Sequence, residues 1–469
     1  MTLPHLLRPA PLRKRLWQLA TLLALVTGIF AVGNAFQTED KAVSGRMLGH
    51  DFLAFYTAGT FVREGRTNQL YDLPAVAEFQ QQIAKDANLD ITVDYTKQKF
   101  GPWWNPPFYA WLFVPFSLLS YNKALAAWTL LNLACLGGAI AMLMRMLVPR
   151  WLDHDAMGRP TDWRTTGLVP FLILLSMPFV QAISHGQNSM TSLCLLAGVV
   201  TFWRNKRAIL AGGLCAALAV KPQLAAVVAC GLVISLGYRA ILGLCLGGSL
   251  IVLFTQFTMP GLLVQYLHVL PKNVHWMQVE HAYLWDRHAT LKAFYRMLLQ
   301  GKAAGEMGWL AWGAYVVSGA ILTTLLARAA WSNWRRQTID DPWSLATERT
   351  WRDRLIAATI CCAPLLMPFY FDYDLLLLAI PATLLAAEVL ARPIDASVTR
   401  SERWTTRLWV ALYAWMLINP GMTGLTRLNG NVILLSGIAI LMIRRAHRPA
   451  AKVAKPVIEP QRVDVRRAA

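Results

Sequence analysis

The chain alternates apolar stretches with shorter polar connections over most of its length. A helix needs about 20 apolar residues to cross a bilayer, and the two segments that meet at Lys221 reach only about two-thirds of that length. The pattern predicts an all-α polytopic membrane protein with about twelve spans, within a range of roughly ten to thirteen. The candidate crossings are residues 16–36, 124–147, 167–184, 188–203, 208–221, 223–238, 240–259, 308–328, 355–371, 375–391, 408–422 and 429–443.

The first long interruption, residues 37–105, exceeds the roughly 12–15 residues of an ordinary loop, and such loops are usually functional or disordered. Residues 52–62 have the aromatic and apolar pattern of a helix lying in the membrane interface. Residues 74–87 predict a more polar helix that begins after Asp72. Residues 103–111 form an aromatic belt that returns the chain to the bilayer. We therefore expect a folded outer segment.

Composition and charge fix the class and the orientation. With 56% hydrophobic and 15% charged residues, the chain is too apolar for a soluble protein. About two-thirds of the 45 Lys and Arg residues fall in connections on one side, including the basic termini 1–15 and 444–469. Both termini are therefore expected in the cytoplasm of a bacterial-type inner membrane, and residues 16–443 form one transmembrane domain with loops 37–105 and 260–306 outside. Anionic inner-leaflet lipids account for the net charge of +19, so no nucleic-acid partner is predicted.

An acid and an imidazole, Asp51 and His50, stand directly before the predicted interfacial helix. A carboxylate at this boundary lies where a lipid-borne substrate presents its polar head group. Acids beside transmembrane helices are also often merely solvated, so position alone leaves both interpretations open. His50 could orient Asp51, although adjacent side chains on a helix or strand point apart.

The predicted topology brings other polar motifs to the same outer face. Lys221, between two apolar half-spans, predicts a broken helix pair and a phosphate or carboxylate partner, unless its ammonium snorkels to the interface.

The sequence has no Walker loop, dinucleotide fingerprint, His-Glu-x-x-His motif or nucleophile elbow. This argues against an ATP-driven pump and against the common hydrolases.

Several short motifs follow one another in order between residues 45 and 225. They are Asp51-Phe52-x-x-Phe55-Tyr56-x-Ala58, Gly65, Leu70-Tyr71-Asp72, Pro106-Pro107 with Pro115, Gly186-Gln187-Asn188 and Lys221-Pro222-Gln223. Their order and spacing resemble the pattern of glycosyltransferase family 87. That family includes the mycobacterial mannosyltransferase that elongates phosphatidylinositol mannosides.

The resemblance implies a GT-C fold, which is a bundle of transmembrane helices with an extracytoplasmic active site and a catalytic acid in the first outer loop. It also implies a polyprenyl-phosphate sugar donor, a lipid-linked or glycan acceptor, and inversion of the anomeric centre. Asp51 falls on the position of the catalytic acid. One carboxylate suffices for such chemistry, because a base must take the acceptor proton while the departing phosphate is already a stable anion.

Charge that develops on the leaving phosphate calls for cations. The candidates for phosphate binding are Lys221, Arg287, His288 and Lys292. The candidates for contact with substrate are His50, Tyr56, Asp72, Asn105, Gln187, Asn188, Gln223, His281, Asp372 and Asp374. Since no second acid stands beside Asp51 in an Asp-x-Asp arrangement, we expect no metal and no other cofactor.

Two departures from the family pattern affect substrate identity. Asn105-Pro106-Pro107 stands where many members have Tyr-Pro-Pro, and Arg287-His288-Ala289-Thr290 replaces an Asn-Gln-Ser-like stretch. The main alternative function is a secondary transporter or glycolipid flippase. Such a protein would need internal inverted repeats, and the sequence shows no convincing pair. A non-catalytic assembly subunit is a third, in which Asp51→Asn would leave function intact.

Overall fold

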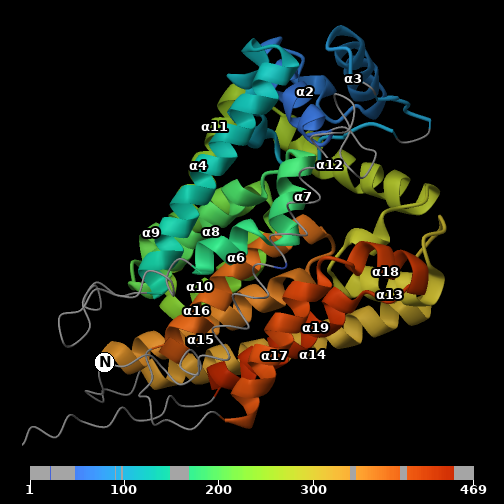
Figure 1. Cartoon of the computed structure of the whole chain (residues 1–469). Coiled ribbons are helices and arrows are strands. Elements are labelled where there is room, and N and C mark those ends of the chain that lie inside the picture. Colours follow the sequence, from blue (N-terminus) through green and yellow to red (C-terminus); the bar gives the residue numbers. More distant parts are fainter. Residues whose placement is uncertain are drawn as a thin grey trace, which may run out of the picture.

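The computed structural model describes Leu22 and residues 48–89, 91–96, 99–147, 168–337, 345–390 and 399–447. These residues form helices joined by loops (Figure 1), and their extended pairing is limited to two isolated bridges, Asp94 with Lys99 and His288 with Phe371. The predicted all-α class is confirmed.

Four helices among the described residues are long and apolar enough to cross a membrane. They are α4 (Tyr121–Leu147), α11 (Tyr238–Thr258), the first 24 residues of α14 (Trp309–Gln337) and α19 (Gly430–His447). The membrane class is thus supported, while the count of about twelve crossings stays a prediction. The predicted first crossing, 16–36, lies outside the described residues except for Leu22.

The remaining helices are shorter or carry more charge. Those that precede α14 in the chain are α2 (Phe52–Arg63), α3 (Leu73–Asp86), α6 (Leu168–Leu174), α7 (Met177–His185), α8 (Ser189–Arg204), α9 (Ala208–Ala217), α10 (Pro222–Leu236), α12 (Leu262–His275) and α13 (Leu291–Gln300). The later ones are α15 (Leu345–Leu366), α16 (Ala379–Leu390), α17 (Arg400–Trp415) and α18 (Asn419–Thr426). Short 3-10 turns join them: η1 (Thr67–Gln69), η2 (Pro107–Phe113), η3 (Phe116–Leu118), η5 (Leu218–Val220), η7 (Trp285–Arg287) and η8 (Asp372–Leu378), together with the π-helical turn η6 (Trp276–Glu280).

Glycines allow α9 and α11 to pack closely. A Cβ atom on Gly243 would lie 2.2 Å from the carbonyl oxygen of Ile209, and one on Gly212 would lie 2.3 Å from that of Ala240. Small residues at such an interface let two helix backbones approach, which matters in lipid because apolar surfaces gain little there by leaving water. The α9–α11 pair therefore depends on both glycines.

Buried ion pairs tie α15 to its neighbours. Arg204, at the end of α8, donates from Nε and Nη2 to the two carboxylate oxygens of Asp353, at 2.7 and 2.8 Å. Arg354 on α15 and Arg445 on α19 both contact Oε1 of Glu388 on α16, at 2.6 and 2.9 Å. Because charges buried this way need their partners, these contacts fix how the helices meet.

The described residues between 48 and 105 are folded, as the sequence predicts for this segment. The predicted helices at 52–62 and 74–87 correspond to α2 and α3, and Asp72 caps α3 by accepting from the backbone N–H of Ala75 at 3.3 Å. The surroundings of α2 differ from the expectation of an interfacial helix. Protein side chains bury ten of its twelve residues. Phe55 stacks on Phe113 of η2 with ring centroids 4.7 Å apart, and its ring also lies against Trp103 and Tyr109 of the aromatic belt, so these aromatic side chains enclose α2.

Candidate active site

Asp51 lies at the N-terminus of α2, where backbone hydrogen bonds join the chain to the end of α7. The backbone N–H of Gly49 donates to the carbonyl of Ser184 at 2.8 Å, and that of Asp51 donates to His185 at 3.1 Å. Gly186 ends α7 in the left-handed region, with φ of +70°. A Cβ atom there would lie 3.0 Å from Cβ of Phe52, so the close approach requires glycine.

Two side chains hold the Asp51 carboxylate. Gln187 Nε2 donates to Oδ2 at 2.6 Å, and His50 Nε2 lies 3.2 Å from Oδ1. Burial alone would raise the pKa of Asp51, but its neighbours, among them His50, Gln187 and Arg287, lower it below its ordinary value. The side chain is still 30% exposed, so an ionised carboxylate remains within reach of a substrate.

His50 contacts Asp51 because residues 48–51 form a turn and not a regular helix or strand. The rule that adjacent side chains point apart does not apply to such a turn. The His50 ring also lies against His185, with centroids 4.6 Å apart. The structure thus places His50 where it can orient the carboxylate.

Arg287 forms the second part of the cluster. Its Nε and Nη2 donate to the two oxygens of Asp372 at 3.2 and 2.8 Å, and its Nη1 contacts Nε2 of His185 at 2.9 Å. Gln181 Nε2 and the backbone N–H of Tyr373 also donate to Asp372, at 3.1 and 3.0 Å. Burial favours the neutral guanidine, yet Asp372 holds the pKa of Arg287 above its ordinary value. Arg287 is therefore a fixed cation, and it contacts His185, the residue whose carbonyl accepts from the backbone N–H of Asp51.

Lys221 forms the third part and has the carboxylate partner that its sequence context predicts. Its Nζ pairs with Oδ1 of Asp374, which also accepts from Ser189 Oγ at 2.6 Å. Lys221 lies between η5 and α10, so the predicted broken helix pair is present. The ammonium has two further N–H groups beyond the one that the ion pair uses.

Lys292, in the first turn of α13, is held differently. Its Nζ donates to Gln278 Oε1 at 3.3 Å and lies 5.5 and 5.2 Å from the ring centroids of Trp285 and Phe369. Among the described residues no acid pairs with it. Burial lowers its pKa accordingly. Because an amide and two aromatic rings surround this ammonium and no acid neutralises it, its positive charge is available to an anion.

His288 is enclosed and held neutral. Its Nδ1 accepts from the backbone N–H of Tyr370 at 3.2 Å, so its proton is on Nε2, which lies 3.0 Å from the hydroxyl of Tyr283. Burial lowers the pKa of His288 to about 3. The side chain is 1% exposed. In this state it offers a phosphate no positive charge; it joins the Arg287 loop to residues 370–371.

Some predicted contact residues lie in structural positions around this cluster. Tyr56 donates to the carbonyl of Leu119 at 2.8 Å, and Asn188 donates to the hydroxyl of Tyr109 at 3.1 Å. The carbonyl of Asn105 accepts from Tyr71 at 2.9 Å.

Others lie at the edges of helices. Nδ1 of His281 is 3.0 Å from the carbonyl of Trp276, and Gln223 is half-buried in the first turn of α10. Asp72 is the cap of α3 described above. The contacts described here for these three residues do not include Asp51, Arg287 or Lys221.

Four participants in the cluster are not among the predicted site residues: Gln181, His185, Ser189 and Tyr373, although the polar motifs 185–188 and 370–374 of the sequence include His185 and Tyr373. The signal for the first two was local, because Gln181 and His185 are polar residues one helical turn apart in an otherwise apolar segment. Ser189 gave no such signal, while Tyr373 stands between the acids Asp372 and Asp374 in the sequence. Only the structure identifies them as members of the cluster, because Ser189 donates to Asp374 and the backbone N–H of Tyr373 donates to Asp372.

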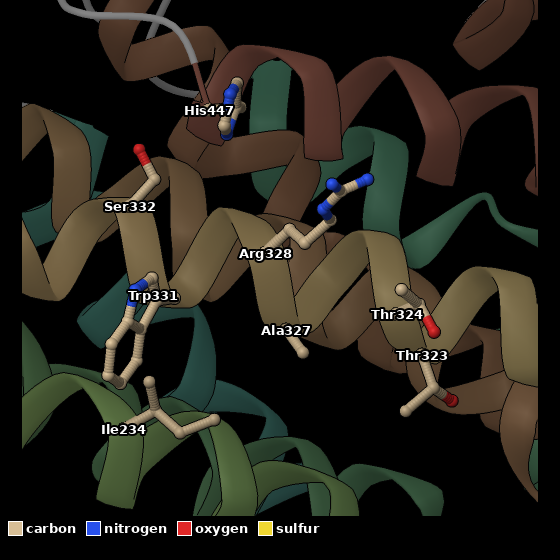
Figure 2. A pocket seen from close by; sticks show the side chains of 8 residues that line it. All are labelled: Ile234, Thr323, Thr324, Ala327, Arg328, Trp331, Ser332 and His447. Atoms are coloured by element: carbon tan, nitrogen blue, oxygen red, sulfur yellow. The ribbon is translucent and has the colours of Figure 1, made fainter.

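A separate hollow of about 790 Å³ lies elsewhere, on the exposed flank of α14. Figure 2 shows Arg328 and Trp331 of α14 on it, with Ile234 from α10 and His447 from α19 to either side. It shares no residue with the Asp51 cluster, and its lining contains no acid. We therefore place the candidate active site at the Asp51 cluster, where the titratable groups converge.

The match to a family model decides the class of the protein. Residues 103–348 match the model of glycosyltransferase family 87, which is more than half of the chain. The chain belongs to glycosyltransferase family 87. The matched region contains Gln187, Lys221, Arg287 and Lys292, whereas Asp51 and Asp372 lie outside it. Neither a curated protein nor a solved structure matches the chain.

Proposed function

We propose that this family 87 glycosyltransferase moves a sugar from a polyprenyl-phosphate donor to a lipid-linked or glycan acceptor, with inversion. The reaction takes place on the extracytoplasmic face of a bacterial-type inner membrane. The observation that carries the proposal is the Asp51 carboxylate, ionised and 30% exposed, with the Arg287 cation close enough to lower its pKa. A base beside a cation is the pair that an inverting transfer to a hydroxyl requires.

Asp51 acts as the general base. The acceptor hydroxyl gives its proton to a carboxylate oxygen of Asp51 while its own oxygen bonds to the anomeric carbon. The bond from that carbon to the phosphate oxygen breaks at the same time, and its electron pair stays on the polyprenyl phosphate. His50 and Gln187 hold one oxygen of Asp51 each, which directs the carboxylate.

The leaving phosphate gains charge as its bond to the sugar breaks. Arg287 uses three of its five N–H groups on Asp372 and His185, so one N–H on each terminal nitrogen is left for a phosphate oxygen. Lys292 brings a positive charge that no described acid neutralises, and Lys221 brings one that Asp374 partly offsets. Arg287 and Lys292 are accordingly the principal phosphate ligands in the proposal.

The reaction proceeds without a metal ion in this proposal, because the fixed cations supply the positive charge. Addition of a chelator should leave the rate unchanged. Loss of activity with EDTA that Mg²⁺ or Mn²⁺ restores would overturn this part of the proposal.

The purified protein tests the function directly in detergent with a panel of polyprenyl-phosphate sugars and lipid acceptors. We expect release of polyprenyl phosphate together with a glycosylated acceptor of inverted anomeric configuration. A retained configuration would refute the single-base mechanism. Movement of an intact glycolipid across proteoliposomes, with no sugar donor consumed, would establish the transporter alternative instead.

A further inference from the structure

His185 is the last residue of α7, and each of its two ring nitrogens contacts a different residue. Nδ1 is 2.8 Å from the carbonyl oxygen of Gln181, and Nε2 is 2.9 Å from Nη1 of Arg287. The side chain stands between the turn that carries Asp51 and the loop that carries Arg287.

These two partners determine the tautomer of His185. A carbonyl oxygen can only accept a hydrogen bond, so Nδ1 must carry a proton. A guanidinium can only donate, so Nε2 must be free to accept from Arg287. The imidazole is therefore neutral and protonated on Nδ1. Burial, with Arg287 adding to it, lowers the pKa of His185 to about 3, in agreement with this state.

His185 completes the support of Arg287. Asp372 holds the edge of the guanidinium formed by Nε and Nη2, and His185 holds Nη1 at the other end. A planar group bound at both ends cannot rotate about its axis. The His185 ring also lies against His50, with centroids 4.6 Å apart, and His50 in turn contacts Asp51.

We propose that His185 is a positioning residue for the transfer reaction. By accepting from Nη1, it sets the direction in which Arg287 presents its remaining N–H groups to the phosphate of the sugar donor. The inference rests on the proposed function, since it assigns the phosphate to Arg287. His185 does not exchange a proton with substrate in this role.

Two conservative substitutions separate this role from simple support of the α7 terminus. In His185→Gln the side-chain oxygen stands as many bonds from the backbone as Nε2 and can accept from Arg287, while the bond to Gln181 is lost. In His185→Asn the amide nitrogen matches Nδ1 and keeps the bond to Gln181, while the contact with Arg287 is lost. His268→Asn, on the exposed face of α12, is the matched control.

The measured quantities are kcat/KM for the sugar donor and the affinity for polyprenyl monophosphate in detergent. A hydrogen bond to a charged group justifies an expected loss of about tenfold or more in both for His185→Asn. His185→Gln should stay within about threefold of wild type, and His268→Asn should match wild type. Thermal unfolding confirms that all variants are folded.

Equal values for the Gln and Asn variants, or a weaker Gln variant, would overturn the inference. Failure of the wild-type protein to transfer sugar would refute the proposed function instead. Even then, the affinities for polyprenyl monophosphate would show whether His185 orients Arg287 toward phosphate, with Arg287→Ala as the reference for a lost ligand.

Discussion

Asp372 offers the sharpest test of how the cluster is held together. Its Oδ1 accepts from Arg287 Nη2 and from the backbone of Tyr373, while Oδ2 accepts from Arg287 Nε and from Gln181. In Asp372→Asn the new amide nitrogen faces two hydrogen-bond donors whichever way it is turned. The substitution also leaves the buried Arg287 charge without its partner.

The structure sets the size of the effect. Removing one member of a buried ion pair costs about 3–5 kcal/mol of unfolding free energy, because the other charge stays desolvated. We expect a loss of this size for Asp372→Asn and a similar loss for Arg287→Gln. The double variant should lose less than the sum of the two by about 2–3 kcal/mol, since no unpaired charge remains.

Unfolding by SDS in mixed micelles, followed by tryptophan fluorescence, measures these free energies. Asp86→Asn, at the exposed end of α3, is the control and should change stability by less than about 0.5 kcal/mol. Losses in the single variants that simply add in the double variant would show that Arg287 and Asp372 do not depend on each other, which would refute the reasoning.

Three further predictions test other parts of the molecule. Burial lowers the pKa of His288 from 6.5 to about 3, so the unfolded chain takes up the proton at a higher pH than the folded chain. Acidification from pH 7.5 to 5.0 should therefore lower the unfolding free energy of the wild type by about 2 kcal/mol through this group. The His288→Asn variant should lack this part of the loss. Gly243→Ala should destabilise the α9–α11 pair by about 1–3 kcal/mol, while Gly248→Ala, whose Cβ meets nothing within 4 Å, should be neutral in the same assay; equal effects would contradict the packing argument. Lys292→Gln should lower kcat/KM for the sugar donor about a hundredfold without loss of thermal stability, and a fully active variant would remove Lys292 from the phosphate site.

Local patterns in the sequence predict much of the fold. The helices at 52–62 and 74–87 have nearly the bounds of α2 and α3, because apolar spacing and the cap at Asp72 are properties of neighbouring residues. The enclosure of α2 could not be predicted in the same way. It depends on η2, which folds over α2 and brings Phe113 against Phe55.

The candidate site shows the same division. The sequence context of Lys221 predicts an anionic partner, because a charge between two apolar half-spans is costly without one. The sequence could not name Asp374, which is 153 positions away and meets Lys221 only through packing. His50 and His185 were underestimated, since the turn at residues 48–51 and the left-handed Gly186 bring their rings together.

The central claim is that Asp51 is the base that activates the acceptor, and the turnover number of Asp51→Asn tests it most directly. With a sugar donor that the wild type consumes, kcat should fall by about two to four orders of magnitude, while the affinity for polyprenyl monophosphate stays close to that of the wild type. Asp86→Asn should turn over normally in the same preparation. A folded Asp51→Asn protein that transfers sugar at the wild-type rate would contradict the account.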